Sequence, residues 1–470
     1  MTNERAWAIL LRMRTQEHIR MVGTHLLLAL STCLALAGSA PAVEHQVTST
    51  PKNHDLDNND NFSPSGQWLC YDTRETTGPG IDNCTAIEAV NITSGEERVL
   101  YTPAHVVTGA RPAPGIGAVS FNPTAETVIF IHGPSVEELG ARGPYGKPNR
   151  QGAIVPLDGS GTRHWADCRD IDTTRDTLLG AHRGGTHRHE YCLDGSRIGF
   201  TYDDFLLPQY DRTIGCMLPS PKAPGGASHY FMILVPVVPK DTAKPGEIEK
   251  AWGDSWVGAH GEHRAFIGKI RNADGVTYDQ SLFVVDLPKN IDLASIDSGG
   301  PTRFPAPPKG ITIRRLTHAW ADGIVRGSHD GTQVAYYAKD AQGQTQIFIV
   351  PVDGGDTHKD PAKHPQQLTR FPGGVAQFHR WHPSGDTLFC ITAKNAIVAV
   401  DARPGATFGA VTPLTPEGGP ERSRLVLSPD GATLAYNRPV PATGPDGNPL
   451  RTYDGKDFLQ IFTLPAAPGK

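Results

Sequence analysis

The stretch VLSPDGATLAYNRP (residues 426–439) joins a short apolar run to an alternating strand through the turn sequence S-P-D-G. Proline fixes φ, aspartate caps the turn and glycine takes the left-handed position, so the stretch predicts a β-hairpin. The pattern of an apolar or aromatic residue, S-P-x-G or a relative, and an alternating strand occurs five more times. The other copies are NFSPSGQWLCYDT (61–73), SFNPTAETVIFIHG (120–133), EYCLDGSRIGFTYDD (190–204), GSHDGTQVAYYAKD (327–340) and RWHPSGDTLFCITAK (380–394).

A third strand that ends in a turn follows these hairpins. A seventh unit lacks the turn motif, but HRAFIGKI (263–270) supplies a partner for its strand SLFVVDLPKN (281–290). Seven units of about 40–60 residues, each a small antiparallel sheet, predict an all-β, seven-bladed β-propeller. The expected third strands are AIEAVNITSGE (86–96), AIVPLDGSG (153–161), HYFMILVPVV (229–238), QIFIVPVDGG (346–355), AIVAVDARPG (396–405) and LQIFTLPAAPG (459–469).

A Leu-Thr pair recurs between units, at Leu316-Thr317, Leu368-Thr369 and Leu414-Thr415. The N-terminal sequence QVTS (46–49) has the same form, displaced to the other end of the chain. We predict that this N-terminal strand completes the last blade and closes the ring, which removes exposed sheet edges.

The predicted propeller is one domain, residues 43–470. Two Pro/Gly-rich stretches near 203–262 and 289–312 break the repeat and are predicted to be surface insertions. The first of them contains GEIEKAWGDSW (246–256), which we interpret as a short helix.

Residues 1–42 have the form of a signal peptide, with arginines, the apolar run LLLALSTCLALA and an A-P-A cleavage site. Met21 is an alternative start, since residues 21–42 alone form a compact signal. Cys33 offers a weaker alternative as a lipidation site. The signal predicts a periplasmic or secreted protein that does not insert in a membrane after cleavage.

The composition indicates which classes of binding partner and which cysteine chemistry to expect. The net charge of −5 over 470 residues gives no reason to expect nucleic acid. The cysteines show no CxxC spacing. Cys70 and Cys84 lie on strands expected to be neighbours and could form a disulfide, or they are buried small apolar residues.

The hairpin units resemble the PD40 repeats of TolB-type propellers, which are WD40-like, and the propeller part of oligopeptidases. A closer resemblance, over nearly the whole mature chain, is to the YidR family of bacterial propellers of undefined function. That family is similar to oligogalacturonate lyases, which implies a divalent metal, typically manganese, held by three histidines and a glutamine. The blocks that carry the resemblance are FIHGP (130–134), RGGTHRHEYCLDGSRIGFTYDD (183–204), WVGAHGEHRAFIG (256–268), FPAPPKGITIRRLT (304–317) and WHPSG (381–385).

The innermost strand of a blade runs along the channel just before the hairpin turn. Strict alternation then puts the residues two and four before the turn's aromatic on the channel side. Three units have polar residues there: His189 and His187, His379 and Gln377, Asp60 and Asn58.

Three imidazoles and one amide match the ligand set that the lyase resemblance implies, and they suit Mn²⁺. His187, His189, Gln377 and His379 are therefore the predicted metal ligands. The sequence THRH departs from the lyase pattern by one residue, and such a slip moves a side chain to the opposite face. A polar channel without metal, and a carbohydrate or peptide cleft without metal, are the alternatives.

Arg183, beside two glycines that permit close backbone approach, is a candidate for binding an anion, as are Asn58 and Asp60 for binding a ligand. His263 and Arg183 are the candidates for a catalytic role. The leading hypothesis is a metal-dependent lyase that cleaves uronate oligosaccharides by β-elimination at the channel mouth. The alternative is a non-catalytic, TolB-like module that binds a ligand or a protein on one face.

Overall fold

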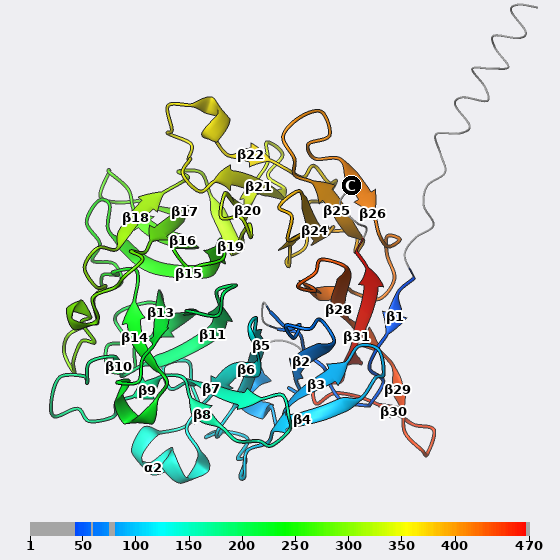
Figure 1. Ribbon diagram of the computed structural model, residues 1–470, viewed down its shortest axis with the longest axis horizontal. Helices are drawn as coiled ribbons and strands as arrows, with labels where there is room; N and C mark the ends of the chain where they lie inside the picture. Colours follow the sequence, from blue (N-terminus) through cyan, green and yellow to red (C-terminus); the bar gives the residue numbers. More distant parts are fainter. Residues whose placement is uncertain (1–42, 58–59, 75–79, 467–470) are drawn as a thin grey trace, which may run out of the picture. The chain divides into compact units, whose positions relative to one another are not determined.

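Short antiparallel strands are the main regular elements of the computed structural model, which describes residues 43–57, 60–74 and 80–466. They form seven sheets arranged in a ring around a central channel (Figure 1). The predicted seven-bladed propeller is therefore confirmed. Among the described residues, no helix has the length and apolar character that a membrane crossing requires.

Five blades each take four consecutive strands, numbered outward from the channel. Blade 2 has β5 (Ile116–Asn122), β6 (Ala125–His132), β7 (Gln151–Pro156) and β8 (His164–Trp165); blade 3 has β11 (Gly185–Tyr191), β12 (Ile198–Asp203), β13 (Thr213–Pro219) and β14 (His229–Ile233); blade 4 has β15 (Ile248–Val257), β16 (His263–Arg271), β17 (Tyr278–Asp286) and β18 (Thr312–Arg315). Blade 5 has β19 (Ala321–Gly327), β20 (Gln333–Lys339), β21 (Thr345–Pro351) and β22 (Gln366–Gln367); blade 6 has β23 (Arg380–Trp381), β24 (Thr387–Ile391), β25 (Ile397–Asp401) and β26 (Val411–Pro413).

Blades 1 and 7 depart from this plan. Blade 1 has β2 (Trp68–Asp72), β3 (Ile87–Asn91) and β4 (Glu97–Tyr101), and single bridges at Asp55 and Phe62 hold the inner segment beside β2. Blade 7 combines β27 (Ser423–Leu427), β28 (Thr433–Val440) and β31 (Phe458–Pro465) with the N-terminal β1 (His45–Gln46).

The remaining elements are short and lie in connections. They are the parallel pair β9 (Cys168–Arg169) and β10 (Ala181–His182), the hairpin β29 (Ala442–Thr443) and β30 (Pro449–Leu450), the helix α2 (Leu139–Arg142), and the 3-10 turns η2 (Gly80–Asn83), η3 (Val136–Glu138), η4 (Pro224–Gly226), η5 (Leu293–Ser295) and η6 (Pro361–Lys363).

The S-P-D-G sequence forms the hairpin turn for a local reason. The hydroxyl of Ser428 donates to Oδ1 of Asp430 (2.5 Å) and accepts the amide of Thr433 (2.9 Å). Gly431 has φ of 74°, and a Cβ there would collide with His382 of the preceding blade. Glycine is therefore required both by the turn and by the close approach of two blades.

The Leu-Thr pairs bond to the third strands of blades 4, 5 and 6. The amides of Ile347 and Ile397 donate to the hydroxyls of Thr369 and Thr415 at 2.9 Å. Thr48 makes the same bond with the amide of Ile461 (2.9 Å), while Val47 donates to the carbonyl of Ile461 (2.8 Å). The predicted closure of the last blade by the N-terminal strand is thus confirmed.

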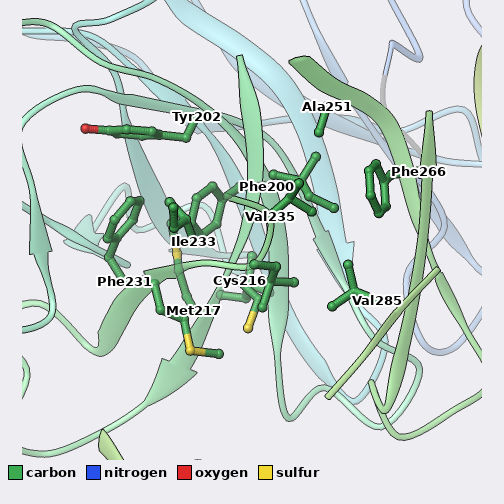
Figure 2. Packing of buried hydrophobic residues seen from close by; sticks show 14 of the residues in the cluster. Phe200, Tyr202, Cys216, Met217, Phe231, Ile233, Val235, Ala251, Phe266 and Val285 are labelled. Carbon is green, nitrogen blue, oxygen red and sulfur yellow. The ribbon is translucent and has the colours of Figure 1, made fainter. Parts of the chain in front are cut away.

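The core lies between neighbouring blades rather than inside one sheet. Phe200 and Phe231 of blade 3 stack with ring centroids 5.1 Å apart. Phe266 and Val285 of blade 4 belong to the same buried cluster, as Figure 2 shows. Each buried side chain of this size contributes about 1.5–3 kcal/mol, so the packed faces hold adjacent blades together.

The structure corrects the prediction of an insertion near 203–262. That region supplies β13, β14 and β15, and the supposed helix GEIEKAWGDSW is part of β15, the inner strand of blade 4. The strand expected as third in blade 3, at His229, is the fourth. Residues 289–312 do lie mainly in the connection between β17 and β18.

Cys70 and Cys84 are both buried free thiols, so the suggested disulfide is not formed. They pack in one apolar cluster with residues of blades 1 and 2. The alternative prediction, that Cys70 and Cys84 are buried small apolar residues, is confirmed.

Replacing Thr48 by valine should lower the free energy of unfolding by about 1–3 kcal/mol, because it leaves the buried amide of Ile461 without an acceptor. Thr369→Val and Thr415→Val should cost a similar amount, since they remove the equivalent bond. Chemical denaturation measures all three. Thr412→Val on the exposed strand β26 is the control, and a Thr48→Val variant as stable as this control would contradict the closure.

Candidate functional site along the axial channel

A β-bulge recurs in the inner strand of four blades. In each case two residues oppose one residue of the next strand, and the first of the two has a left-handed backbone. The bulge interrupts alternation, so it decides which side chains face the channel. The left-handed residues are Ala118 (φ 53°), Arg188 (φ 58°), Gly253 (φ 66°) and Arg424 (φ 59°).

The bulge in blade 3 turns both predicted histidines toward the blades. Nε2 of His189 lies 3.1 Å from the hydroxyl of Thr186, next to Gly152 of blade 2. Nε2 of His187 lies 3.2 Å from Oδ2 of Asp203 in its own blade. Both side chains are buried in protein.

Arg188 and Glu190 take the places nearer the channel. Nη1 of Arg188 donates to the carbonyl of Asp254 in blade 4 (2.6 Å). The carboxylate of Glu190 accepts from Ser255 (2.8 Å) and lies 3.1 Å from Nη1 of Arg264. Side chains of blade 3 therefore bridge to blade 4 around the channel.

In blade 6 the two predicted ligands, Gln377 and His379, line one narrow cavity but differ in burial. Nε2 of His379 lies 3.4 Å from the carbonyl of Ala335, and its ring meets Tyr337 edge-on at 4.9 Å, so it packs against blade 5. Gln377 is exposed and lines a surface pocket.

The four predicted ligands do not fit a manganese site. His189 packs against blade 2, whereas His379 packs against blade 5. Within residues 43–57, 60–74 and 80–466, no group of three or more His, Cys, Asp or Glu side chains is placed to hold a metal ion. The sequence-based metal site therefore gains no support from the geometry.

The axis itself holds an ionic cluster from five blades. Asp60, Glu190, Ser255, Arg326 and Arg380 line one cavity of about 70 Å³. Burial, and then the carboxylate of Glu190, raise the pKa of Asp60 to about 6. This narrow space has the polar lining that the sequence predicted for the channel. Asn58, predicted beside Asp60, lies outside the described residues.

The two catalytic candidates lie away from the channel. Arg183 is buried, and its guanidinium donates to the hydroxyl of Thr177 (2.8 Å) and to the carbonyls of Asp172 and Arg175. Nδ1 of His263 lies 2.8 Å from Oδ1 of Asp286 at the end of β16. The structure does not bring them to a common reacting point with the predicted ligands.

A larger pocket of about 510 Å³ lies where the inner strands of blades 6 and 7 begin. Phe378 and Arg424 are adjacent in it, with the guanidinium carbon 5.2 Å from the ring centroid. Nε of Arg424 donates to Asp55 (3.1 Å), which fixes its orientation. Gln377, Lys456 and Asp457 add polar groups to the lining.

Comparison with known proteins places the chain in a family. A family model described as a protein of unknown function (DUF3748) matches residues 115–223. The uncharacterized protein YidR of Escherichia coli (strain K12) is 33% identical over 424 residues, which cover 83% of this chain and 94% of that protein. The chain belongs to the YidR family. The resemblance predicted from the sequence is confirmed.

Solved propellers share the fold of this YidR-family chain at low identity. An oligogalacturonate lyase in complex with manganese is 12% identical, with a TM-score of 0.44, over 78% of this chain and 95% of that one. A putative TolB from Agrobacterium tumefaciens is 15% identical, with a TM-score of 0.35, over 82% and 99%. These values are too low to transfer a site.

The prediction from strict strand alternation did not include the residues that reach the axis. Glu190 and Arg380 each stand one position before the aromatic of the turn, and Arg326 stands at the equivalent place before Gly327. Comparing the repeats at that position would have found these three side chains. Arg188 has no such signal, because nothing in its residue type indicates a left-handed backbone.

Several buried histidines are held neutral. Burial lowers the pKa of His132, His189 and His229 to about 4, and lowers those of His187 and His379 well below the ordinary value. Below about pH 6.5 these histidines bind protons in the unfolded chain but remain neutral in the folded protein. The free energy of unfolding therefore falls as the pH falls. Asp55 and Asp60, with pKa raised to about 6, oppose this trend but are fewer.

The free energy of unfolding should therefore fall between pH 6.5 and 4.5. Replacing His379 by glutamine should reduce the slope of the free energy of unfolding against pH. The reduction should correspond to about one proton, or about 1.4 kcal/mol per pH unit. Gln342→Ala, at an exposed position that carries no titratable group, is the control and should leave the slope unchanged. Urea titrations at several pH values measure it, and an unaltered slope in His379→Gln would show that this histidine titrates normally.

Proposed function

We propose that this YidR-family chain is an exported binding propeller that holds a small carboxylated saccharide in the pocket between blades 6 and 7, without catalysing its cleavage. The observation that carries the proposal is the 510 Å³ pocket, which has the size typical of small-molecule sites. The sequence already offered a non-catalytic binding module as an alternative to the lyase. We assign it a small ligand rather than a protein, because the pocket is bounded on several sides.

The lining supports a ligand that is both polar and partly apolar. The ring of Phe378 and the side chain of Pro439 offer an apolar surface of the kind that packs on a sugar ring. Arg422, Arg424 and Lys456 are cationic, against the acidic Glu421 and Asp457, which favours a ligand with a carboxylate. Arg422 is held by Glu44 (2.7 Å) and Arg424 by Asp55, so two cations are oriented before a ligand arrives.

A metal-dependent lyase is less well supported. That reaction needs a Lewis acid at the uronate carboxylate and a base within reach of the α-proton. Of the four predicted ligands, His189 packs against blade 2, His379 packs against blade 5 and Gln377 is exposed. The two candidates for a catalytic role, His263 and Arg183, make hydrogen bonds away from the channel. Nothing in the described site therefore favours β-elimination over simple binding.

Trigalacturonate should bind the purified chain with a dissociation constant that Gln377→Ala weakens by about tenfold, because an exposed amide in the pocket loses its hydrogen bond to the ligand. Calorimetry measures it, with maltotriose as the neutral ligand and Gln342→Ala, an exposed glutamine of another blade, as the control variant.

Equal affinity in Gln377→Ala and the parent chain, or no binding of either saccharide, would contradict the proposed pocket. Absorbance in the unsaturated-uronate band, recorded with trigalacturonate and added Mn²⁺, checks for cleavage. A steady rise there would restore the lyase and reject the non-catalytic function.

Export rests on the sequence of residues 1–42, which lie outside the described residues. Expressed with its own N-terminus in a Gram-negative host, the chain should be recovered from the periplasm or medium beginning at Val43, as read by mass spectrometry. Leu28→Arg in the apolar run should keep it in the cytoplasm, whereas Thr2→Arg should not. Periplasmic recovery of Leu28→Arg would speak against the signal.

A further inference from the structure

A third cavity, of about 110 Å³, is lined by residues of α2, of β9 and of neighbouring loops. It is separate from the channel and from the proposed saccharide pocket, and shares no lining residue with either. Three guanidinium groups line it, those of Arg142, Arg169 and Arg183.

Arg142 is buried without its full set of partners. Its residue is 6% exposed, and Nη1 donates to the carboxylate of Glu138 (3.2 and 3.3 Å). Among the described residues, Nε and Nη2 have no hydrogen-bond acceptor. Asn149 donates to the carbonyl of Arg142 (2.8 Å) and to that of Pro144, so the loop that presents the arginine is fixed.

Arg169 faces the same space from β9. Nη1 donates to the carbonyl of Gly184 (3.0 Å), while Nε has no acceptor within the described part of the chain. Burial first, and then the charges of Arg142 and Arg183, lower the pKa of Arg169 to about 10. The groups therefore repel one another, which is costly unless an anion lies between them.

The nearby acids already have hydrogen-bond partners, although one of them, Asp170, also lines the cavity, 3.9 Å from Nη2 of Arg183. Asp170 accepts from Arg175 (2.8 and 3.1 Å) and from the amide of Leu178 (2.9 Å). Asp204 accepts from the hydroxyl of Tyr202 (2.7 Å) and from the amides of Leu206 and Leu207. The cavity thus keeps an excess of positive charge and buried donors that a bound anion would satisfy.

We propose that this cavity binds one oxyanion, a carboxylate or a phosphate group, of a ligand whose adjoining part is apolar. A guanidinium presents paired N–H donors that match either group. The volume equals about four waters at about 30 Å³ each, which leaves room for one such group. This proposal does not depend on the saccharide pocket.

The rim supplies the apolar character. Ile171 and Phe205 line the opening and are 51% and 44% exposed, and Leu178 and Leu179 in the following loop are 42% and 45% exposed. The ring of Phe205 lies 4.9 Å from the guanidinium carbon of Arg169. An apolar chain attached to the oxyanion would cover these side chains, which otherwise face solvent.

Calorimetry in a buffer free of oxyanions tests the site with sodium hexanoate, inorganic phosphate and hexanol. Hexanoate or phosphate should bind, hexanol should not, and the tighter of the two anions identifies the group. Arg169→Gln should weaken binding by at least about tenfold, since it removes a charge-assisted hydrogen bond. Arg403→Gln, an arginine of blade 6 paired with Asp401, is the control and should bind like the parent chain.

Absence of binding by both anions at about 10 mM, which is about tenfold above the dissociation constant of a millimolar site, overturns the proposal. Equal affinity in Arg169→Gln and the parent chain does the same. If Arg169→Gln fails to fold, as circular dichroism would show, Arg142→Lys replaces it under the same criterion, because lysine keeps the charge but loses the paired donors.

Discussion

The hydrogen bonds between the N-terminal segment and β31 are the constraint on which the rest of the structure depends. Val47 and Thr48 bond to the backbone of Ile461, and His45 and Gln46 continue the sheet. With that strand in place blade 7 has four strands, and the ring has no open side between blades 7 and 1. The pocket proposed for a saccharide depends on the same junction of the N-terminal segment with blade 7, since Glu44 and Asp55 orient two of its arginines.

Which side chains reach the channel is set by the bulges, and this is where prediction from the sequence was weakest. The repeats predicted the number of blades, and the Leu-Thr pairs predicted the closing strand, because both depend on local turn chemistry and strand pairing. Orientation inside the ring depends on one extra residue in the inner strand, which reverses the alternation. Gly253 marks such a point in the sequence, whereas Arg188 and Arg424 adopt the same backbone without any mark.

The region 203–262 was misinterpreted for a related reason. GEIEKAWGDSW has charges and apolar residues at spacings that suit a helix, and its glycine was not recognised as a bulge. In the fold its second tryptophan, Trp256, donates a hydrogen bond to the neighbouring blade, as the turn aromatic Trp381 does in blade 6. Nε1 of Trp256 donates to the carbonyl of Glu190 (2.9 Å), as Nε1 of Trp381 donates to that of Arg326 (3.0 Å). The arginine cavity had no signal either, since its residues come from separate loops.

The pairing of β1 with β31 also sets the order of folding. About 400 residues separate the two strands, so this contact is among the most non-local that the chain makes. During synthesis β1 has no partner until the last strand has emerged, while blades 2 to 6 can form from consecutive segments. Ring closure is therefore the last step available to the chain, and the earlier intermediates carry an unpaired edge on which chaperones or neighbouring copies can act.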